Sequence, residues 1–338
     1  MDRSFPIPSV RIGSKKVPRI ILGCMPFLGE SYQGQEKNLL YAQRFQEPKN
    51  LKGIILKGIF EYGITAMAAV PANTGFLATS LLKVVKEIED FYRISLALAP
   101  CISLRLRLGS KPVDDYRRWV TYFHQASRNL EKEDFQGKER LLLKFLKDPI
   151  LLTRPGWERR FPEALEGLSP YGKEESYSLD FDEASLREAL KSLEGHEILF
   201  VEPGSETDFL VAMERFDLLE ALMKLLRSLG FENILFGIHH AGRTIPALEA
   251  SGLPFQGYVT PVNRIGALML PSQEEALKAI KASSKPIVAI KPLAGGRIRP
   301  GEAFSYVFKD VGVDACMIGV ASEEELDEDL EAALKFIN

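Results

Sequence analysis

Short apolar segments alternate with longer segments of helical period along most of the chain, and this rhythm constrains the fold more than any other feature. A short apolar run followed by an amphipathic helix is typical of a βα unit with a buried parallel strand. Eight such runs occur, at residues 20–23, 64–69, 94–99, 198–201, 233–238, 258–260, 287–290 and 316–318. Eight βα units favour a closed barrel over an open sheet, so we predict an α/β fold, a (β/α)8 TIM barrel.

The N-terminal segment adds a hairpin to this barrel. Residues 9–20 read as two short strands that turn at Gly13 and Ser14. No GxGxxG motif follows the first apolar run, which argues against an open dinucleotide-binding sheet. A polar stretch at residues 29–50 is too long for a simple βα connection, so we expect a functional loop there. Residues 209–228 read as one helix.

The regular rhythm stops between residues 101 and 181, where helical pieces occur but no clear strand does. We predict one barrel over residues 1–338, with 101–181 as an insertion after the third strand that caps the C-terminal (mouth) face. The insertion has an excess of Lys and Arg and contains Tyr116, Trp119, Tyr122, Phe123 and Trp157. These aromatic side chains either line a ligand site or form the core of an accessory subdomain.

Composition narrows the partners that we expect. The chain has 338 residues, 46% of them hydrophobic, and a formal net charge of −3. This charge gives no reason to expect nucleic acid or an anionic membrane as a partner, and no apolar run is long enough to span a bilayer. The beginning of the sequence has no apolar signal region, and the three cysteines are too few for a disulfide framework and show no CxxC spacing. We therefore expect a cytoplasmic protein with a small-molecule ligand; the oligomeric state stays open.

Five segments resemble conserved blocks of the aldo-keto reductase superfamily, in the same order. They are SLREALKSLEGHEILFVEPG (185–204), FGIHHAGRTIPALEASGL (236–253), TPVNRIG (260–266), KPLAGGRI (291–298) and IGVASEEELDEDLEAA (318–333). The resemblance covers residues 182–338 well and 9–93 loosely, and it does not cover 101–181. It implies a (β/α)8 barrel that reduces carbonyl compounds with a nicotinamide cofactor, NAD(P).

The residues that this family uses for hydride transfer are missing. The family's catalytic Asp, Tyr, Lys and His would fall near Ala68, Asn73, Ala99 and Glu202. A shift of the alignment by one or two residues supplies no replacement, because residues 64–80 contain no Asp, Tyr or Lys. The family's mechanism, in which the Tyr acts as general acid, is therefore not expected here.

The loops after the seventh and eighth strands are candidates for binding an anion. Barrels commonly bind phosphate there through backbone N–H groups and a helix N-terminus, and the resemblance implies the same for a cofactor's phosphates. The alternative is that the glycines make a turn and the serine caps a helix. Against a nicotinamide cofactor, Ala321 stands where the family often has Arg, and three glutamates follow Ser322. The candidate cofactor-binding residues are Lys291, Leu293, Gly295, Gly296, Arg297 and Ser322.

Glu202, His239 and His240 end two neighbouring strands. A carboxylate beside an imidazole could perform acid–base catalysis, whereas a metal site lacks any supporting ligand spacing, so no metal is expected. Because side chains alternate along a strand, we expect His239 to face the mouth and His240 to point elsewhere. We name Glu202 and His239 as candidate catalytic residues and expect them to come within hydrogen-bonding reach, directly or through one water.

Further candidates follow other strands. Asn263 and Arg264 could bind a substrate carboxylate or phosphate, although Arg264 could equally form a surface ion pair. Cys24 and Cys101 both follow strands at the mouth and could face each other, but a free cysteine is usually a small buried apolar residue.

Three functions agree with these patterns. The first is an aldo-keto-reductase-like barrel that binds an anionic, phosphate- or carboxylate-bearing small molecule at the C-terminal face, whether or not it is an enzyme. The second is a degenerate NAD(P)-dependent oxidoreductase. The third is a non-catalytic ligand-binding or sensor barrel.

Overall fold

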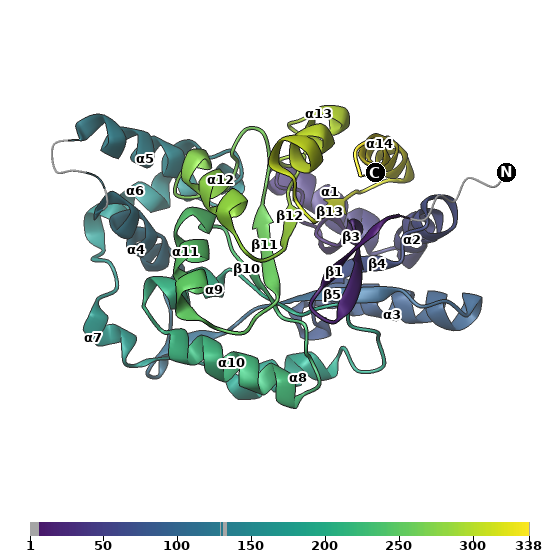
Figure 1. Ribbon diagram of the computed structural model, residues 1–338, viewed down its shortest axis with the longest axis horizontal. Helices are drawn as coiled ribbons and strands as arrows, with labels where there is room; N and C mark the ends of the chain where they lie inside the picture. The colour runs from purple at the N-terminus through teal and green to yellow at the C-terminus, as the bar shows by residue number, and fades with distance from the viewer. Residues whose placement is uncertain (1–6, 129, 131–133, 338) are drawn as a thin grey trace.

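Eight parallel strands form the predicted barrel (Figure 1). The computed structural model describes residues 7–128, 130 and 134–337, so residues 1–6, on which part of the targeting expectation rests, lie outside it. The strands follow the order β10-β11-β12-β13-β3-β4-β5-β9. A parallel bridge between Val201 and Ile234 joins the two ends of this order, and the Val201 N–H donates to the Asn233 carbonyl at 2.9 Å. The strand bounds are β3 Ile20–Gly23, β4 Ala66–Ala69, β5 Ala97–Ile102, β9 Glu202–Pro203, β10 Leu235–Gly237, β11 Gly257–Pro261, β12 Ile287–Ile290 and β13 Ala315–Gly319.

The predicted N-terminal hairpin is present as β1 (Ser9–Ile12) and β2 (Lys15–Pro18). Gly13 makes the turn with a left-handed φ of 57°, which a side chain rarely adopts. Asn233, just before β10, donates to the Ile12 carbonyl at 3.2 Å and accepts from the Ser14 N–H at 3.2 Å. This asparagine fixes the hairpin to the amino end of a barrel strand.

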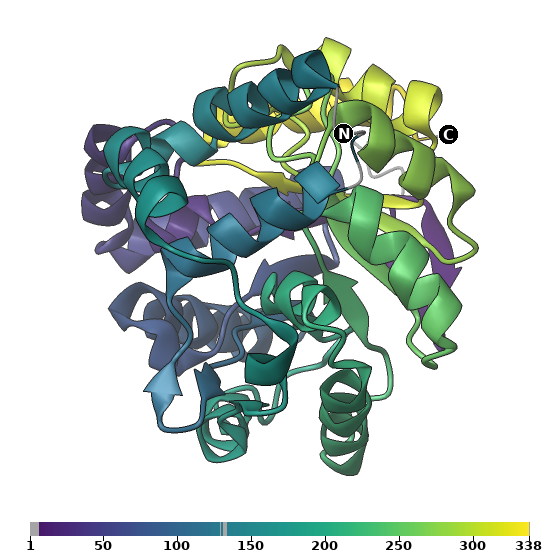
Figure 2. The same cartoon turned by 90° about the vertical axis from the view of Figure 1, so that its left-hand side faces the viewer.

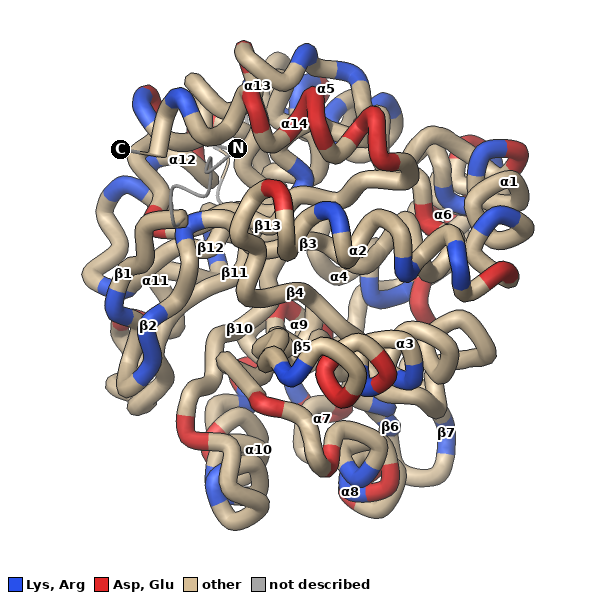
Figure 3. Tube along the Cα trace, turned by 90° about the vertical axis from the view of Figure 1, so that its right-hand side faces the viewer, with Lys and Arg blue, Asp and Glu red and all other residues tan. Residues whose placement is uncertain are grey.

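Amphipathic helices surround the strands. Figure 3, in which β9 is not labelled, shows the other barrel strands around a common centre. Each helix buries an apolar stripe against the strands, as the helical period predicts. Their bounds are α2 Pro48–Tyr62, α3 Phe76–Tyr92, α8 Glu183–Lys191, α10 Phe216–Ser228, α11 Ala241–Ser251, α12 Gln273–Ala282, α13 Pro300–Ser305 and α14 Glu323–Leu334.

Three expected elements differ from the structure. The apolar run at 198–201, expected as the fourth strand, forms only isolated parallel bridges at Ile198 and Val201, and the strand at this place is β9, Glu202–Pro203. The segment expected as one helix at 209–228 is two helices, α9 (Glu206–Ala212) and α10, because Glu214 adopts a left-handed φ of 57° between them. The polar stretch at 29–50 contains a helix, α1 (Gln35–Phe45), whose exposed residues weaken its apolar period.

The segment 101–181 forms a subdomain whose helices lie together at one end of the molecule, at the left in Figure 1 and in front in Figure 2. A small antiparallel sheet in the order β7-β6-β8 escaped the sequence analysis, because its strands have only two or three residues. The elements are β6 Leu106–Leu108, β7 Lys111–Pro112, α4 Asp115–Arg128, α5 Phe135–Lys147, η3 Leu151–Thr153, α6 Trp157–Gly167, α7 Lys173–Ser176 and β8 Leu179–Phe181.

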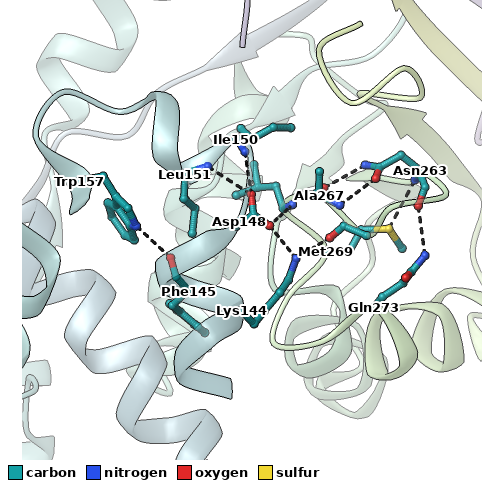
Figure 4. Close-up of polar contacts among 12 residues, drawn as sticks. Lys144, Phe145, Asp148, Ile150, Leu151, Trp157, Asn263, Ala267, Met269 and Gln273 are labelled. Carbon is teal, nitrogen blue, oxygen red and sulfur yellow. Dashed lines mark hydrogen bonds and ion pairs between the residues drawn. The ribbon is translucent and has the colours of Figure 1, made fainter. Parts of the chain in front are cut away.

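Aromatic rings form the core of this subdomain. Trp119, Tyr122 and Trp157 are buried, and the Trp157 ring stacks on Phe161 at 4.6 Å between centroids. The Trp157 indole N–H also donates to the Phe145 carbonyl at 2.9 Å (Figure 4). These three rings therefore belong to the core of the subdomain, which is one of the two roles expected for the aromatic side chains.

One buried carboxylate joins the subdomain to the barrel. Asp148, after α5, accepts from the Ile150 and Leu151 N–H groups at 3.0 and 3.2 Å, and from the Leu268 N–H at 2.7 Å (Figure 4). The Lys144 ammonium lies 2.6 Å from the same carboxylate. Because Leu268 belongs to the loop after β11, this network holds that loop against the subdomain.

Candidate functional site

A cavity of about 720 Å³ lies where several barrel strands reach their carboxyl ends. Its wall includes residues that directly follow β3, β10 and β12, Cys101 near the end of β5, and parts of α1 and α14. Parallel barrels place their sites at this end because the βα loops converge there. Of the predicted site residues, the cavity wall contains Glu202, His239, Lys291, Leu293, Gly295, Gly296 and Arg297.

Lys291 stands at the end of β12, in the cavity wall. Its backbone adopts a left-handed φ of 56°, as does that of Tyr32, at 58°. The Lys291 ammonium lies 4.6 Å from the centre of the Tyr32 ring. Burial lowers the pKa of Lys291 from 10.5 to about 8, although the Glu202 carboxylate opposes this effect. Two strained non-glycine residues whose side chains meet in a cavity are a common feature of functional sites.

Glu202 enters the cavity from β9 and is itself buried. Burial raises its pKa from 4.5 to about 7, while the charge of Lys291 and a hydrogen bond from the Cys101 thiol favour the carboxylate. Gly237 on β10 provides the space for this side chain, since a Cβ there would lie 2.5 Å from a Glu202 carboxylate oxygen. Neither Glu202 nor Lys291 forms an ion pair within the described residues.

The two histidines point in different directions. His239 lines the cavity, and burial together with the Lys291 charge lowers its pKa well below 6.5. His240 is buried outside the cavity wall, where its ring packs 4.1 Å from the Tyr122 ring of α4. No direct hydrogen bond joins Glu202 to His239 in the described part of the chain; the charged group that acts on both is Lys291.

Asp208 positions the histidine pair and was missed by the sequence analysis. Its buried carboxylate accepts from the His239 N–H at 2.7 Å, from the His240 N–H at 3.3 Å and from the Thr244 hydroxyl at 2.6 Å. Burial raises the pKa of Asp208 to about 6. An acidic residue in the first turn of a helix is too common to stand out in a sequence, and only the fold brings α9 against the start of α11.

The glycine pair after β12 makes a tight turn against the loop after β3. Gly295 has a φ of 69°, and a Cβ there would lie 2.8 Å from the Tyr32 carbonyl oxygen. The Arg297 guanidinium donates to the carbonyls of Tyr32 at 2.7 Å, Ala294 at 2.8 Å and Pro149 at 3.0 Å. Arg297 therefore fastens two βα loops and the subdomain together and keeps only part of its hydrogen-bonding capacity for a ligand.

Ser322 caps a helix, which was the structural alternative to anion binding. It is the N-cap of α14 and accepts from the Glu325 N–H at 3.1 Å. The Glu325 carboxylate in turn accepts from the Ala321 N–H at 2.7 Å. Ser322 is not in the cavity wall, but Glu325, Glu328 and Asp329 of α14 are. The acidic character of this helix is visible in Figure 3.

This end of the cavity does not fit the phosphates of a nicotinamide cofactor. Two N–H groups at the start of α14, those of Ala321 and Glu325, already donate to the side chains of Glu325 and Ser322, and the Glu325 and Glu328 carboxylates in the adjacent wall repel a polyanion. Of the positions aligned with the family's tetrad, Ala68 and Glu202 line the cavity, whereas Ala99 is fully buried and Asn73 is exposed and outside the cavity wall.

Asn263 and Arg264, the candidate substrate residues, lie outside the cavity wall. Asn263 is buried and shapes its own loop, donating to the Ala267 carbonyl at 2.9 Å and accepting from the Ala267 N–H at 2.8 Å. Arg264 forms an exposed ion pair with Glu302 at 3.0 Å. Both residues therefore have structural partners.

Cys24 and Cys101 both line the cavity as free thiols, and burial raises both pKa values. A thiol whose pKa is raised by burial is a poor nucleophile at neutral pH. Within the described residues, no group of three or more His, Cys, Asp or Glu side chains could hold a metal ion. In that same part of the chain, no helix has the length and apolar character to cross a membrane.

The fold and the position of the cavity define a (β/α)8 barrel with its candidate site at the carboxyl ends of the strands. This fold is similar to that of aldo-keto reductases. The crystal structure of PA4992 from Pseudomonas aeruginosa, provisionally described as an aldo-keto reductase, has 14% sequence identity and a TM-score of 0.55, covering 100% of this chain and 99% of that chain. A second Pseudomonas aeruginosa structure of the same description has 14% identity and a TM-score of 0.56, covering 99% and 98%. No family model and no curated protein matches the sequence. At this identity the likeness establishes the fold, and any statement on the reaction depends on the site.

Proposed function

We propose that this barrel binds a small anionic molecule, bearing a phosphate or a carboxylate, in the cavity at the carboxyl ends of its strands. The observation that carries the proposal is the distribution of charge around the cavity. Lys37 of α1, Arg297 and Arg299 line the cavity, and within the described residues Lys37 and Arg299 form no ion pair. Unpaired cations beside an enclosed space attract an anion, because the ligand replaces the missing counter-charge.

The size of the cavity agrees with a metabolite. Sites for small molecules have volumes of roughly 300–1,000 Å³, and this cavity has about 720 Å³. We expect the ligand's charged group to contact Lys37 and Arg299, since these two cations have no carboxylate partner within the described residues. Its remainder then extends over Lys291 and Glu202.

In this proposal, the subdomain at residues 101–181 is a cap that covers the mouth of the barrel. Three contacts support this role. Arg297 donates to the Pro149 carbonyl, Lys144 donates to the Gly266 carbonyl, and the Leu268 N–H donates to Asp148. They connect the subdomain to the loops that follow β11 and β12, which are loops at the carboxyl end of the barrel.

Isothermal titration with inorganic phosphate and with pyruvate tests anion binding. We expect saturable binding of at least one of them and a roughly tenfold or greater weakening in Lys37→Gln and Arg299→Gln, because a hydrogen bond to a charged group contributes about 1.5–3 kcal/mol. Lys224→Gln is the matched control, since it removes one positive charge from an exposed i,i+4 pair on α10. Binding that is absent for both anions, or equal in all three variants, contradicts the proposal.

Fluorescence titration with NADPH tests the alternative of a nicotinamide enzyme. We expect no saturation in the micromolar range, because two amides at the start of α14 already donate to side chains and the Glu325 and Glu328 carboxylates lie in the adjacent wall. Tight binding of NADPH would instead favour a degenerate oxidoreductase.

A further inference from the structure

We propose that Lys291 is a nucleophilic amine that forms a Schiff base with a carbonyl-bearing anionic molecule, and that Glu202 carries the protons of this step. The inference rests on the proposed function, because the anion-binding part of the cavity brings the carbonyl compound to the amine. It extends that function from binding to covalent chemistry and names the substrate class.

The placement of the Lys291 amine favours this role. The side chain begins at the end of β12 and lines the enclosed cavity, so a bound molecule can reach it. The Tyr32 ring lies 4.6 Å from the ammonium, and no carboxylate within the described residues holds the amine in an ion pair. A structural lysine at the surface usually has a carboxylate partner or is hydrated. Lys291 instead contacts the Tyr32 ring and lines the cavity.

The cavity also makes the amine available in its reactive form. Only a neutral amine attacks a carbonyl carbon, and burial lowers the pKa of Lys291 to about 8. A decrease from 10.5 to about 8 raises the neutral fraction at pH 7 by about 300-fold. The other nucleophiles in the wall are less suited, because the pKa values of Cys24 and Cys101 are raised by burial.

Glu202 is suited to transfer protons beside this amine. Glu202 and Lys291 line the same cavity, and the charge of each favours the charged form of the other. Burial raises the pKa of Glu202 to about 7, and a group with a pKa near the working pH can both give and accept a proton. Burial disfavours the charged form of both groups, which favours the neutral amine and the carboxylic acid that the step needs.

The step balances without an oxidant or a reductant. The Lys291 nitrogen forms a bond to the carbonyl carbon, and the π electrons move to the oxygen. Glu202 gives a proton to that oxygen and accepts one from the nitrogen, which leaves a carbinolamine. Glu202 then protonates the hydroxyl group, the C–O bond breaks, and water leaves. The products are a protonated imine on Lys291, a carboxylate on Glu202 and one water molecule.

Reductive trapping with glyoxylate tests the proposal, since glyoxylate is a small carbonyl compound that carries a carboxylate. The full chain is treated at pH 7 with limiting glyoxylate and sodium cyanoborohydride, and peptide mass spectrometry follows the labelling of each lysine. We expect Lys291 to be labelled at least tenfold faster than the exposed Lys224, which serves as the internal control. Lys291→Arg keeps the positive charge. In this variant the fast labelling at position 291 should disappear, and the slow labelling of the other lysines should stay the same. A Lys291 that is labelled no faster than Lys224 overturns the inference.

Two comparisons separate the parts of the argument. In Glu202→Gln we expect slower labelling of Lys291; an equal or faster rate contradicts the proton-transfer role, because loss of the carboxylate by itself would increase the neutral amine. Anion binding by titration together with slow labelling of Lys291 leaves the proposed function intact and overturns only the Schiff base, which favours a non-catalytic binding barrel. Failure of the proposed function appears separately, as the absence of binding of phosphate and pyruvate.

Discussion

Asp148→Asn is expected to destabilise the protein strongly, since this carboxylate joins the subdomain to the barrel. One oxygen accepts from the Ile150 and Leu151 N–H groups, and an asparagine oxygen can keep those bonds. The other oxygen accepts from the Leu268 N–H at 2.7 Å and from the Lys144 ammonium at 2.6 Å. An amide NH₂ at that place faces two donors and satisfies neither.

The expected loss follows from these two contacts. A hydrogen bond to a charged group contributes about 1.5–3 kcal/mol, so two lost bonds amount to about 3–6 kcal/mol. Breaking a buried ion pair from one side costs about 3–5 kcal/mol, which agrees with this sum. The Asp148 side chain is fully buried and that of Lys144 is 19% exposed, so water can compensate only at the lysine. We therefore expect a decrease of about 3–5 kcal/mol in the free energy of unfolding.

Urea denaturation followed by circular dichroism measures this loss. Glu163→Gln is the control, because it removes a carboxylate from an exposed i,i+4 pair on α6 and should change the free energy by less than about 0.5 kcal/mol. A double-mutant cycle with Lys144→Met should give a coupling energy of at least about 1 kcal/mol between the two side chains. A decrease below about 1 kcal/mol for Asp148→Asn, or no coupling, would refute the assigned role of the network.

Three further predictions concern single buried groups. Gly237→Ala should cost about 1–3 kcal/mol in urea denaturation, because its Cβ would lie 2.5 Å from the Glu202 carboxylate; it should also change the rate of Lys291 labelling. Burial raises the pKa of Asp329 to about 8, so its contribution to stability is present at low pH and is lost as pH rises from about 4 to 8; Asp329→Asn should therefore stabilise the fold more at pH 8 than at pH 5. Burial lowers the pKa of His240 to about 3, so folding opposes its protonation below pH 6.5, and His240→Phe should raise the urea midpoint more at pH 5 than at pH 8. An effect of equal size at the two pH values would contradict either pH prediction.

The candidate site could be predicted only in part. The sequence indicated that Glu202, His239 and Lys291 follow barrel strands, which is sufficient to expect them at one end of the barrel. It did not indicate that Lys291 is an enclosed amine rather than one more charge beside a phosphate. The signal that could have suggested this is local: Lys291 follows the fully apolar strand Ile287–Ile290 without a polar residue between them.

The sequence by itself determined the eight βα units and the N-terminal hairpin, because the periods of strands and helices are local properties of the chain. Only the tertiary structure decided which strand ends share a cavity, since closure of the barrel brings together residues far apart in the chain, such as Tyr32 and Lys291. The tertiary structure also decided that the side chains of Arg297, Ser322 and Asn263 form hydrogen bonds with other groups of the protein. Those partners are fixed by packing between loops, and loop packing has no periodic pattern that a sequence can display.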